Sequence, residues 1–364
     1  MRKAKGAVMT GINEPFEVRE FEITKAPAKM AGIELIASGI CGTDIHIHRG
    51  KIPIGTPTII GHEFVGKVND ISKEDSENHG IFPGDNVIVD IACPCEECEL
   101  CKAGDDANCL NMGVTNGGSI DVAPYLYGGY VEYNYSPVKN LVKIPNELDP
   151  KMVCVYACAG PTTLHAFRLA EQANCQIEKA KVAVVQGLGP VGTFAVLYLA
   201  SLGIPNIIAL TAGDNKEREE LAKKLGATEV INLSKVDTDT VTQHIRSISG
   251  IGADVVFEAS GSPKAVPQGM EMLRNRGTYL VPGQYSNSGA IEIEPQRITF
   301  NALHIIGSSQ YSVSDVENYL DFLVKNPHLH DCILSLASAY KVEDINSAID
   351  DAKLGKNIKT VLVK

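Results

Sequence analysis

Four cysteines in one short segment have the spacing of a metal site. Cys95, Cys98, Cys101 and Cys109 form a C-x2-C-x2-C-x7-C pattern, with Gly104 in the return loop. Two-residue spacers let neighbouring thiolates point at one cation, and four thiolates complete a closed tetrahedral zinc site. The glycine permits the tight turn that returns the fourth ligand. The pattern therefore predicts a structural zinc, because a four-thiolate site leaves no position for a substrate.

Two other interpretations of this cluster are weaker. Ferredoxins also use C-x2-C-x2-C for iron–sulfur clusters, but they continue with C-x3-C-P, whereas here the fourth cysteine comes seven residues later and no proline follows. Disulfides are uncommon in the cytosol, where clustered cysteines are more often metal ligands. Cys93 lies outside the pattern, and we expect it to bind nothing.

A second set of residues has the composition of an open, catalytic zinc site. Cys41, His46, His62 and Glu63 combine a thiolate, two imidazoles and a carboxylate, which are the donors of catalytic zinc centres. Cys41 follows the strand-like run IELIASGI. Spacing alone is weak support here, because the possible ligands are far apart and a lone Cys or His is more often core or surface.

The run KVAVVQGLGPVG at 181–192 indicates a dinucleotide site. A strand-like segment leads directly into a G-x-G-x-x-G turn and then a helix-like segment, which is the context that gives this motif its meaning. The glycines allow the tight turn, the approach of a pyrophosphate and close helix packing, and the anion lies at the helix N-terminus. The predicted cofactor-binding residues are Gly187, Gly189, Pro190, Val191 and Gly192.

The elements that must position these residues are of two kinds. Strand and helix patterns alternate for some 130 residues around the glycine motif, which predicts a doubly wound parallel sheet. We expect this α/β cofactor domain at 160–308, inserted in a β-rich catalytic domain made of 1–159 and 309–364, with the active site where the domains meet. The acidic segment 69–80 is predicted to be a solvated loop.

Composition limits the function classes. The 364-residue chain has a formal net charge of −11 and no long basic run, so nucleic acid is not expected as a partner. No apolar segment follows the basic N-terminus, which argues against a signal peptide. The longest apolar run is interrupted by glycines and a proline, which argues against a membrane helix. A cytoplasmic location is the expectation.

The segments GICGTDIH, GHEFVG and CEECELCKAGDDANC occur in the order seen in zinc-containing medium-chain alcohol dehydrogenases. The chain resembles this family over essentially its whole length. The resemblance implies a Rossmann cofactor domain inserted in a GroES-like catalytic domain, with two zinc ions per chain. It also implies that Cys41 and His62 bind the catalytic zinc, with Glu63 beside or on the metal. In that family Thr43 takes the substrate proton and His46 passes it towards solvent.

The family requires one more protein ligand, in the segment VCVYACAGPTTLHAF. Its pattern of a cysteine, two small residues and then a threonine implies Cys158 as the ligand and Thr162 near the nicotinamide. Cys154 is the competitor and fits that pattern less well. His48, two residues beyond His46, is expected to be a solvated surface histidine without a role.

The cofactor preference rests on one position. NAD-preferring domains usually end the second strand with an acid that binds the ribose hydroxyls. Here Thr211 stands at that point, and Asp214 comes three residues later. Thr211 with Gly213 and Lys216 could accept a 2′-phosphate, which mildly favours NADP over NAD, although Lys216 could equally be an ordinary exposed lysine.

These patterns together predict a zinc-dependent dehydrogenase that transfers a hydride between an alcohol and NAD(P). The segment CGTDIH is common among polyol and threonine dehydrogenases of the family, which favours a secondary alcohol or polyol. The alternatives are a zinc-independent quinone or enoyl reductase of the same fold and a non-enzymatic zinc-ribbon module with a nucleotide-sensing domain. The expected partners are a small alcohol or carbonyl compound and further copies of the chain, as a homodimer or homotetramer.

Overall fold

The computed structural model describes residues 2–364. The chain divides into two compact units, which are described separately below. Unit 1 comprises Met1–Pro161 and Gln310–Lys364, and unit 2 comprises Thr162–Ser309. Unit 1 is therefore built from both ends of the chain, and unit 2 from its middle.

Unit 1 is rich in β-structure. Its main sheet has the order β16-β17-β3-β4-β5-β9, with β8 paired to β3. All its pairs are antiparallel except β16 with β17. The strands of unit 1 are β1 (Lys3–Val8), β2 (Glu17–Glu22), β3 (Met30–Gly39), β4 (Glu63–Asp70), β5 (Asn86–Val89), β6 (Ala92–Cys93), β7 (Gly113–Val114), β8 (Tyr133–Pro137), β9 (Leu141–Lys143), β16 (Ala337–Lys341) and β17 (Lys359–Val363).

The helices of unit 1 are mostly short. They are α1 (Gly42–His48), α2 (Lys73–His79), α3 (Glu99–Lys102), α4 (Pro150–Val155), α11 (Val313–Lys325), α12 (His330–Leu334) and α13 (Ile345–Lys353), and α5 (Ala159–Gln172) continues into unit 2. Helices α4 and α13 pack against strands of the main sheet. The longest helix wholly within unit 1, α11, begins with a capping box in which Ser312 and Asp315 bind each other's backbone N–H groups.

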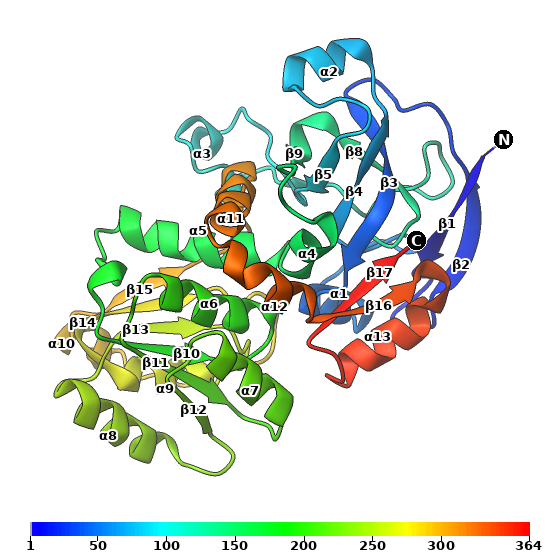
Figure 1. Ribbon diagram of the computed structural model, residues 1–364. Helices are drawn as coiled ribbons and strands as arrows, with labels where there is room; N and C mark the ends of the chain where they lie inside the picture. The colour runs from blue at the N-terminus through cyan, green and yellow to red at the C-terminus, as the bar shows by residue number, and fades with distance from the viewer. Residues whose placement is uncertain (1) are drawn as a thin grey trace. The chain divides into compact units, whose positions relative to one another are not determined.

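The last strand of the chain pairs with a strand from its N-terminal part within this sheet. The C-terminal strand β17 runs antiparallel to β3, with Val361 opposite Gly39 (Figure 1). On its other side β3 pairs with β4, with Gly39 opposite Glu63. One end of the sheet therefore brings together the residues that follow β3 and those at the starts of β4 and β17. This end carries the candidate metal site described below.

Unit 2 is a parallel sheet with the order β12-β11-β10-β13-β14-β15. Its strands are β10 (Val182–Gln186), β11 (Asn206–Thr211), β12 (Glu229–Asn232), β13 (Ala253–Glu258), β14 (Leu273–Val281) and β15 (His304–Gly307). Its helices, beside most of α5, are α6 (Pro190–Ser201), α7 (Lys216–Lys224), α8 (Thr238–Ser249), α9 (Ala265–Met272) and α10 (Gln296–Phe300).

Helices cover both faces of this sheet (Figure 1). Every residue of the central strand β10 is buried, as expected for a parallel strand covered on both sides. On one face Val182 and Val184 belong to a core cluster with Val241 and Ile245 of α8, while α6 packs on the other. The order β12-β11-β10 followed by β13-β14-β15 reverses direction beside β10, which confirms the predicted doubly wound fold.

The acidic segment 69–80 differs from the prediction of a solvated loop. Residues Lys73–His79 form α2, whose first turn is capped by the hydroxyl of Ser72 and which ends at Gly80 in a left-handed conformation. Asp75 is buried, and its carboxylate accepts a hydrogen bond from the backbone N–H of Lys29. The prediction was wrong because a serine cap and a terminal glycine are enough to begin and end a short polar helix.

Candidate metal and cofactor sites

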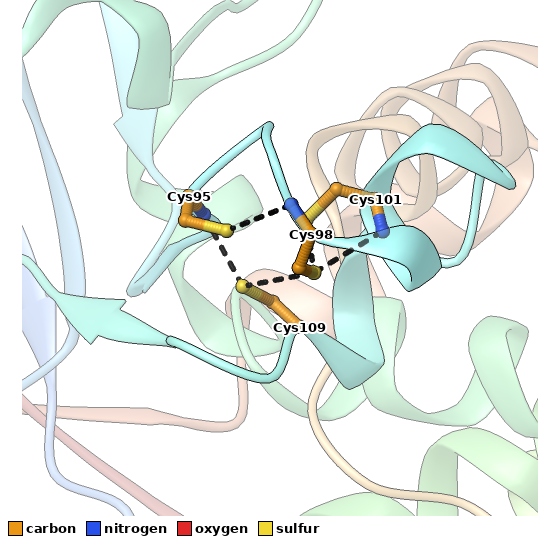
Figure 2. Close-up of side chains that lie close together, drawn as sticks. All are labelled: Cys95, Cys98, Cys101 and Cys109. Atoms are coloured by element: carbon orange, nitrogen blue, oxygen red, sulfur yellow. Dashed lines mark hydrogen bonds between the residues drawn. The ribbon is translucent and has the colours of Figure 1, made fainter.

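The four predicted structural ligands come together in one lobe of unit 1. The thiol groups of Cys95, Cys98, Cys101 and Cys109 lie within 4.8 Å of one another (Figure 2). The Sγ atoms of Cys98 and Cys101 are 3.4 Å apart. Cys93 lies outside this cluster, and its thiol donates instead to Oδ1 of Asn140 at 3.2 Å. The chain thus brings together the four cysteines of the C-x2-C-x2-C-x7-C pattern.

Backbone N–H groups prepare these sulfurs for the thiolate state. The N–H of Cys98 points at Sγ of Cys95 at 3.4 Å, and the N–H of Cys95 points at Sγ of Cys109 at 3.2 Å. The backbone N–H groups of Glu97 and Cys98 lower the pKa of Cys95 to about 6. Burial and the neighbouring sulfurs of Cys98 and Cys109 raise the pKa of Cys101 to about 12. Four thiolates at this distance need a cation, and zinc fits the donor set.

A second cluster lies at the end of the main sheet of unit 1. Donor atoms of Cys41, His62, Glu63 and Cys158 also lie within 4.8 Å of one another. Cys41 is the residue before α1, two positions after the end of β3. His62 and Glu63 stand at the start of β4, and Cys158 lies in the turn between α4 and α5. Two thiols, an imidazole and a carboxylate fit a zinc ion.

One carboxylate orients two of these donors. Oδ2 of Asp44 accepts the backbone N–H of Cys41 at 2.8 Å, and Oδ1 lies 3.1 Å from Nδ1 of His62. The Asp44 side chain is fully buried. Because the carboxylate can only accept, Nδ1 of His62 carries the hydrogen and Nε2 keeps the lone pair that a metal needs.

The second carboxylate has a buried cationic partner. Oε2 of Glu63 accepts a hydrogen bond from Nζ of Lys359, and both side chains are almost completely buried. Nζ also approaches the carbonyl oxygen of Ile40 at 3.4 Å. Gly39 makes room for this pair, because a Cβ there would come within 1.7 Å of Oε2 of Glu63. Glu63 thus belongs both to the metal cluster and to an ion pair.

The protonation of this cluster also favours a cation. A hydrogen bond with Cys158 holds the pKa of Cys41 well below its usual range, whereas the pKa of Cys158 is raised by the same bond and by burial. Cys41 is therefore the more acidic of the two thiols. Burial raises the pKa of Glu63 to about 7, against the opposing charge of Lys359. A divalent cation would favour the thiolate forms and neutralise the buried negative charge.

Of the two cysteines in the helical segment, only Cys158 joins the metal cluster. Cys154 lies on α4, is fully buried, and its thiol faces the carbonyl oxygen of Glu63 at 3.5 Å. Helix α4 turns Cys154 towards the backbone of β4, and the helix ends before Cys158. The residue types alone could not separate these two positions.

The residues proposed for proton transfer lie on α1. Oγ1 of Thr43 is 3.7 Å from Sγ of Cys41, beside the cluster. Burial, together with the cations Lys51 and Arg49, lowers the pKa of His46, which therefore remains neutral at pH 7.

The expectation for His48 was wrong. The ring is only 3% exposed, and its Nε2 donates to the carbonyl oxygen of Glu14 at 2.8 Å. It stacks on Phe16 at a centroid distance of 5.2 Å. A buried stacked histidine has the same sequence appearance as a surface one, because the difference lies in a contact with residues 32 to 34 positions away.

Lys359, Tyr311 and Asp90 were not identified from the sequence. Tyr311 is buried, and burial with the charges of Cys158 and Asp90 raises its pKa, so its hydroxyl lies within electrostatic reach of the cluster. Asp90 is 1% exposed, and its Oδ2 has no hydrogen-bond partner among residues 2–364. Burial raises the pKa of Asp90 to about 8. No local pattern marks these residues, since each depends on contacts distant in sequence.

In unit 2 the glycine motif joins β10 to α6. Gly187 has φ of +93°, in the left-handed region that favours glycine. A Cβ on Gly192 would lie 1.9 Å from the carbonyl oxygen of Gly187, so only glycine allows the helix to pack here. Gly189 precedes α6, and Pro190 opens it. The first N–H groups of α6 thus face the turn, in the arrangement that binds a dinucleotide pyrophosphate.

The end of β11 carries no carboxylate on its last residue, Thr211. Asp214 is exposed and forms an ion pair with Lys235, and Lys216 is the exposed first residue of α7. Nη1 of Arg218 donates to the carbonyl oxygen of Leu188 at 3.1 Å, which ties α7 to the glycine turn. Thr162 lies in α5.

Comparison with known proteins gives a consistent result. A family model described as "Alcohol dehydrogenase GroES-like domain" matches residues 28–146, and one described as "Zinc-binding dehydrogenase" matches 190–325. An alcohol dehydrogenase of Geobacillus stearothermophilus is 29% identical over 99% of this chain and 98% of its own length. D-xylulose reductase A of Aspergillus oryzae is 29% identical over 91% of this chain and 88% of its own length.

A solved structure of an alcohol dehydrogenase from Thermotoga maritima covers 100% of both chains with a TM-score of 0.89 and 26% identity. The chain belongs to the zinc-containing medium-chain alcohol dehydrogenase family and is an NAD(P)-dependent enzyme. This assignment excludes the non-enzymatic zinc-ribbon alternative and supports a zinc-dependent dehydrogenase over a zinc-independent reductase. Separately, none of the helices within residues 2–364 is both long and apolar enough to span a membrane.

Proposed function

We propose that the protein interconverts a secondary alcohol or polyol and its ketone, with zinc bound by Cys41, His62 and Cys158. The observation that carries the proposal is the convergence of these three donors with Glu63 within 4.8 Å, at the end of one sheet. When bound, zinc supplies Lewis acidity towards an alcohol or carbonyl oxygen, and NAD(P) supplies the hydride acceptor or donor. The four-cysteine lobe holds a second, structural zinc.

The residues around the cluster have separate tasks in this proposal. Asp44 fixes the tautomer of His62 and the position of Cys41. Lys359 binds the carboxylate of Glu63 and so competes with the metal for it. Three protein ligands then leave one coordination position for the substrate oxygen.

Thr43 and His46 move the proton. Oγ1 of Thr43, beside Cys41, accepts the hydroxyl proton of the alcohol, and His46 passes it towards solvent. The lowered pKa of His46 keeps its ring neutral and able to accept a proton at pH 7. The reduction of a ketone uses the same groups in reverse.

The substrate class rests on similarity. D-xylulose reductase A is named for a reaction on a ketose, whose carbonyl group becomes a secondary alcohol of a polyol. The segment around Cys41 and Thr43, CGTDIH, resembles that of polyol and threonine dehydrogenases of the family. A primary alcohol is the alternative that the experiment below separates.

For the cofactor we propose NADP in preference to NAD. Thr211 cannot repel a 2′-phosphate, Lys216 is exposed nearby, and Asp214 is held by Lys235. A carboxylate at the strand end favours NAD by binding the ribose hydroxyls and repelling the phosphate. Thr211→Asp should therefore lower the ratio of NADP to NAD efficiency by at least about tenfold, since one close charge pair is worth at least 1.4 kcal/mol. An unchanged ratio contradicts the assignment.

Association is proposed through unit 2. Strand β15 lies at an edge of the sheet, so one row of its backbone groups lacks a partner strand within residues 2–364. Large apolar side chains are exposed on or near it, with Phe300 78% exposed and Ile305 41%. Pairing of two β15 edges would give a homodimer, and two dimers a homotetramer. Ten free cysteines, six of them in the two candidate metal clusters, support a reducing, cytoplasmic location.

The test is an activity panel combined with metal analysis. Zinc-replete protein is assayed with NAD and NADP against primary alcohols, secondary alcohols, polyols and threonine by nicotinamide absorbance. Reduction with secondary alcohols or polyols, and two zinc ions per chain, supports the proposal. Activity confined to primary alcohols contradicts the substrate class. One zinc per chain, held in the lobe, would reject the assignment of Cys41, His62 and Cys158.

A further inference from the structure

Unit 2 contains a cavity of about 360 Å³ that the proposed reaction does not use. It lies where several strands of the parallel sheet begin, and its lining includes Asp254 of β13, Arg274 and Arg276 of β14, and His304 of β15. Lys179, in the turn before β10, completes its charged lining. Cavities of this size are at the lower end of those that hold small metabolites.

The cavity is distinct from the dinucleotide site. The glycine turn follows the last residue of β10, Gln186, whereas the cavity lies at the end where β10 begins, near Val182. Five residues of strand span about 15 Å at 3.3 Å per residue. In open parallel sheets the cofactor binds at the carboxyl ends of the strands, whereas this cavity lies at their amino ends.

The acid in the cavity lining, Asp254, accepts three hydrogen bonds. Oδ2 of Asp254 accepts the backbone N–H groups of Lys181 and Val182 at 2.8 Å and 3.0 Å. Its Oδ1 accepts Nε of Arg274 at 2.6 Å. Asp254 therefore anchors the guanidinium of Arg274 at the cavity, and its negative charge is paired with that cation.

Arg276 is the least satisfied cation of the group. Its side chain is exposed and forms no ion pair within the described residues 2–364, although its backbone N–H donates to Asn301 at 2.7 Å. Its φ is +58°, a left-handed conformation that favours glycine and costs a branched or long residue about 1 kcal/mol. An arginine at such a strained position is consistent with a use for its charge.

We propose that this cavity binds a small dianion, either a dicarboxylate or a phosphate ester. Lys179, Arg274 and Arg276 carry three positive charges and Asp254 one negative charge, so the lining has an excess of two positive charges in a chain whose formal net charge is −11. Two guanidinium groups can each bind a carboxylate or phosphate with paired N–H groups. His304 adds a further donor at the edge strand.

Calorimetric titration tests this proposal without relying on activity. The probes are succinate and inorganic phosphate at constant ionic strength, with NADP and NAD present to fill the dinucleotide site, and succinamide as the neutral analogue of succinate. Saturable binding of at least one dianion is expected, and the tighter probe identifies the ligand class. Absence of saturable binding of both dianions, or equal binding of succinamide, overturns the proposal.

Variants locate the binding. Arg276→Gln should raise the dissociation constant at least about tenfold, because one charge-assisted contact is lost. Arg276→Gly removes the charge and relieves the backbone strain, so it should lose binding while its melting temperature stays the same or rises. Lys224→Gln, which removes an exposed lysine of α7 beside the far edge strand β12, should bind normally. Equal affinities in the Arg276 and Lys224 variants contradict the location.

Discussion

The two metal clusters of unit 1 are built in opposite ways. The lobe site takes its four ligands from residues 95–109, and backbone N–H groups of the same segment point at its sulfurs. The second cluster takes its donor groups from Cys41, His62, Glu63 and Cys158, and Lys359 of the C-terminal strand pairs with Glu63. One site is a property of a loop, and the other is a property of the folded sheet.

The side chains around the two clusters also differ. The lobe has identical donors and no other ionisable side chain among them, which suits a closed structural ion. Around the second cluster Asp44 orients two donors, Lys359 binds Glu63, and Thr43 stands beside Cys41. Such supporting contacts are expected where the position of each ligand matters for chemistry. The comparison predicts that mutations in the two sites affect different properties.

The largest expected effect is on activity, from Cys41→Ser. Loss of this thiolate should lower kcat/KM by at least about 1,000-fold, because the catalytic zinc loses a ligand, while the melting temperature changes little. Steady-state kinetics, zinc analysis and thermal unfolding check it. The matched control is Cys93→Ser, a cysteine outside both clusters, which should keep full activity and two zinc ions. Full activity of Cys41→Ser would remove this cluster from the mechanism.

The next effect is on stability, from Cys98→Ser. Cys98 shares the lobe ion and caps α3 through its sulfur, so the free energy of unfolding should fall by about 3–5 kcal/mol. Protein that remains folded should keep much of its activity. Chemical denaturation with saturating zinc measures the change, with Cys332→Ser as the control. If Cys98→Ser abolished turnover in folded protein and Cys41→Ser did not, the roles of the two sites would be reversed.

A smaller effect is expected from Lys359→Met. Without the ammonium group, the metal is the nearest positive charge to the buried carboxylate of Glu63. This carboxylate should then bind the ion and fill the coordination position that the substrate oxygen would use. Activity should then fall by about 10- to 100-fold while zinc is released to a chelator more slowly. Lys356→Met, which removes an exposed lysine three residues away, should change neither property. Faster zinc release from Lys359→Met would contradict this account of the ion pair.

The smallest effect is a pH dependence from Asp90→Asn. In the folded protein the pKa of Asp90 is raised to about 8, so above its ordinary pKa near 4 the unfolded chain ionises while the folded state stays protonated. Asp90 therefore costs stability progressively as the pH rises from about 4 to 8. The Asn variant should equal the original protein near pH 4 and become progressively more stable than it as the pH rises to about 8.

Denaturation at several pH values measures this difference. Asp121→Asn, the same change at an exposed position, should give no pH-dependent difference. A constant difference between pH 4 and 8 for Asp90→Asn would show that the carboxyl group does not titrate as its burial predicts.

Much of the fold could be predicted from the sequence because its signals are local. The glycine turn before α6 and the alternation of strands and helices in unit 2 predicted a doubly wound sheet, which the strand order confirms. The short polar helix α2 was missed, since the caps Ser72 and Gly80 lie in a segment with no apolar periodicity. The buried position of His48 was missed because it depends on a ring contact with Phe16.

The sequence by itself determined the lobe ligands and the glycine turn, since both are formed by neighbouring residues whose backbone geometry brings them together. It also suggested Cys41 and His62 by their donor types, and the family pattern then selected them as ligands. The tertiary structure decided between Cys158 and Cys154, because a helix end directs one towards the cluster and the other towards the backbone of β4. It alone brought Lys359 to Glu63 across 296 positions, because pairing of β17 with β3 is a long-range contact that no local pattern encodes.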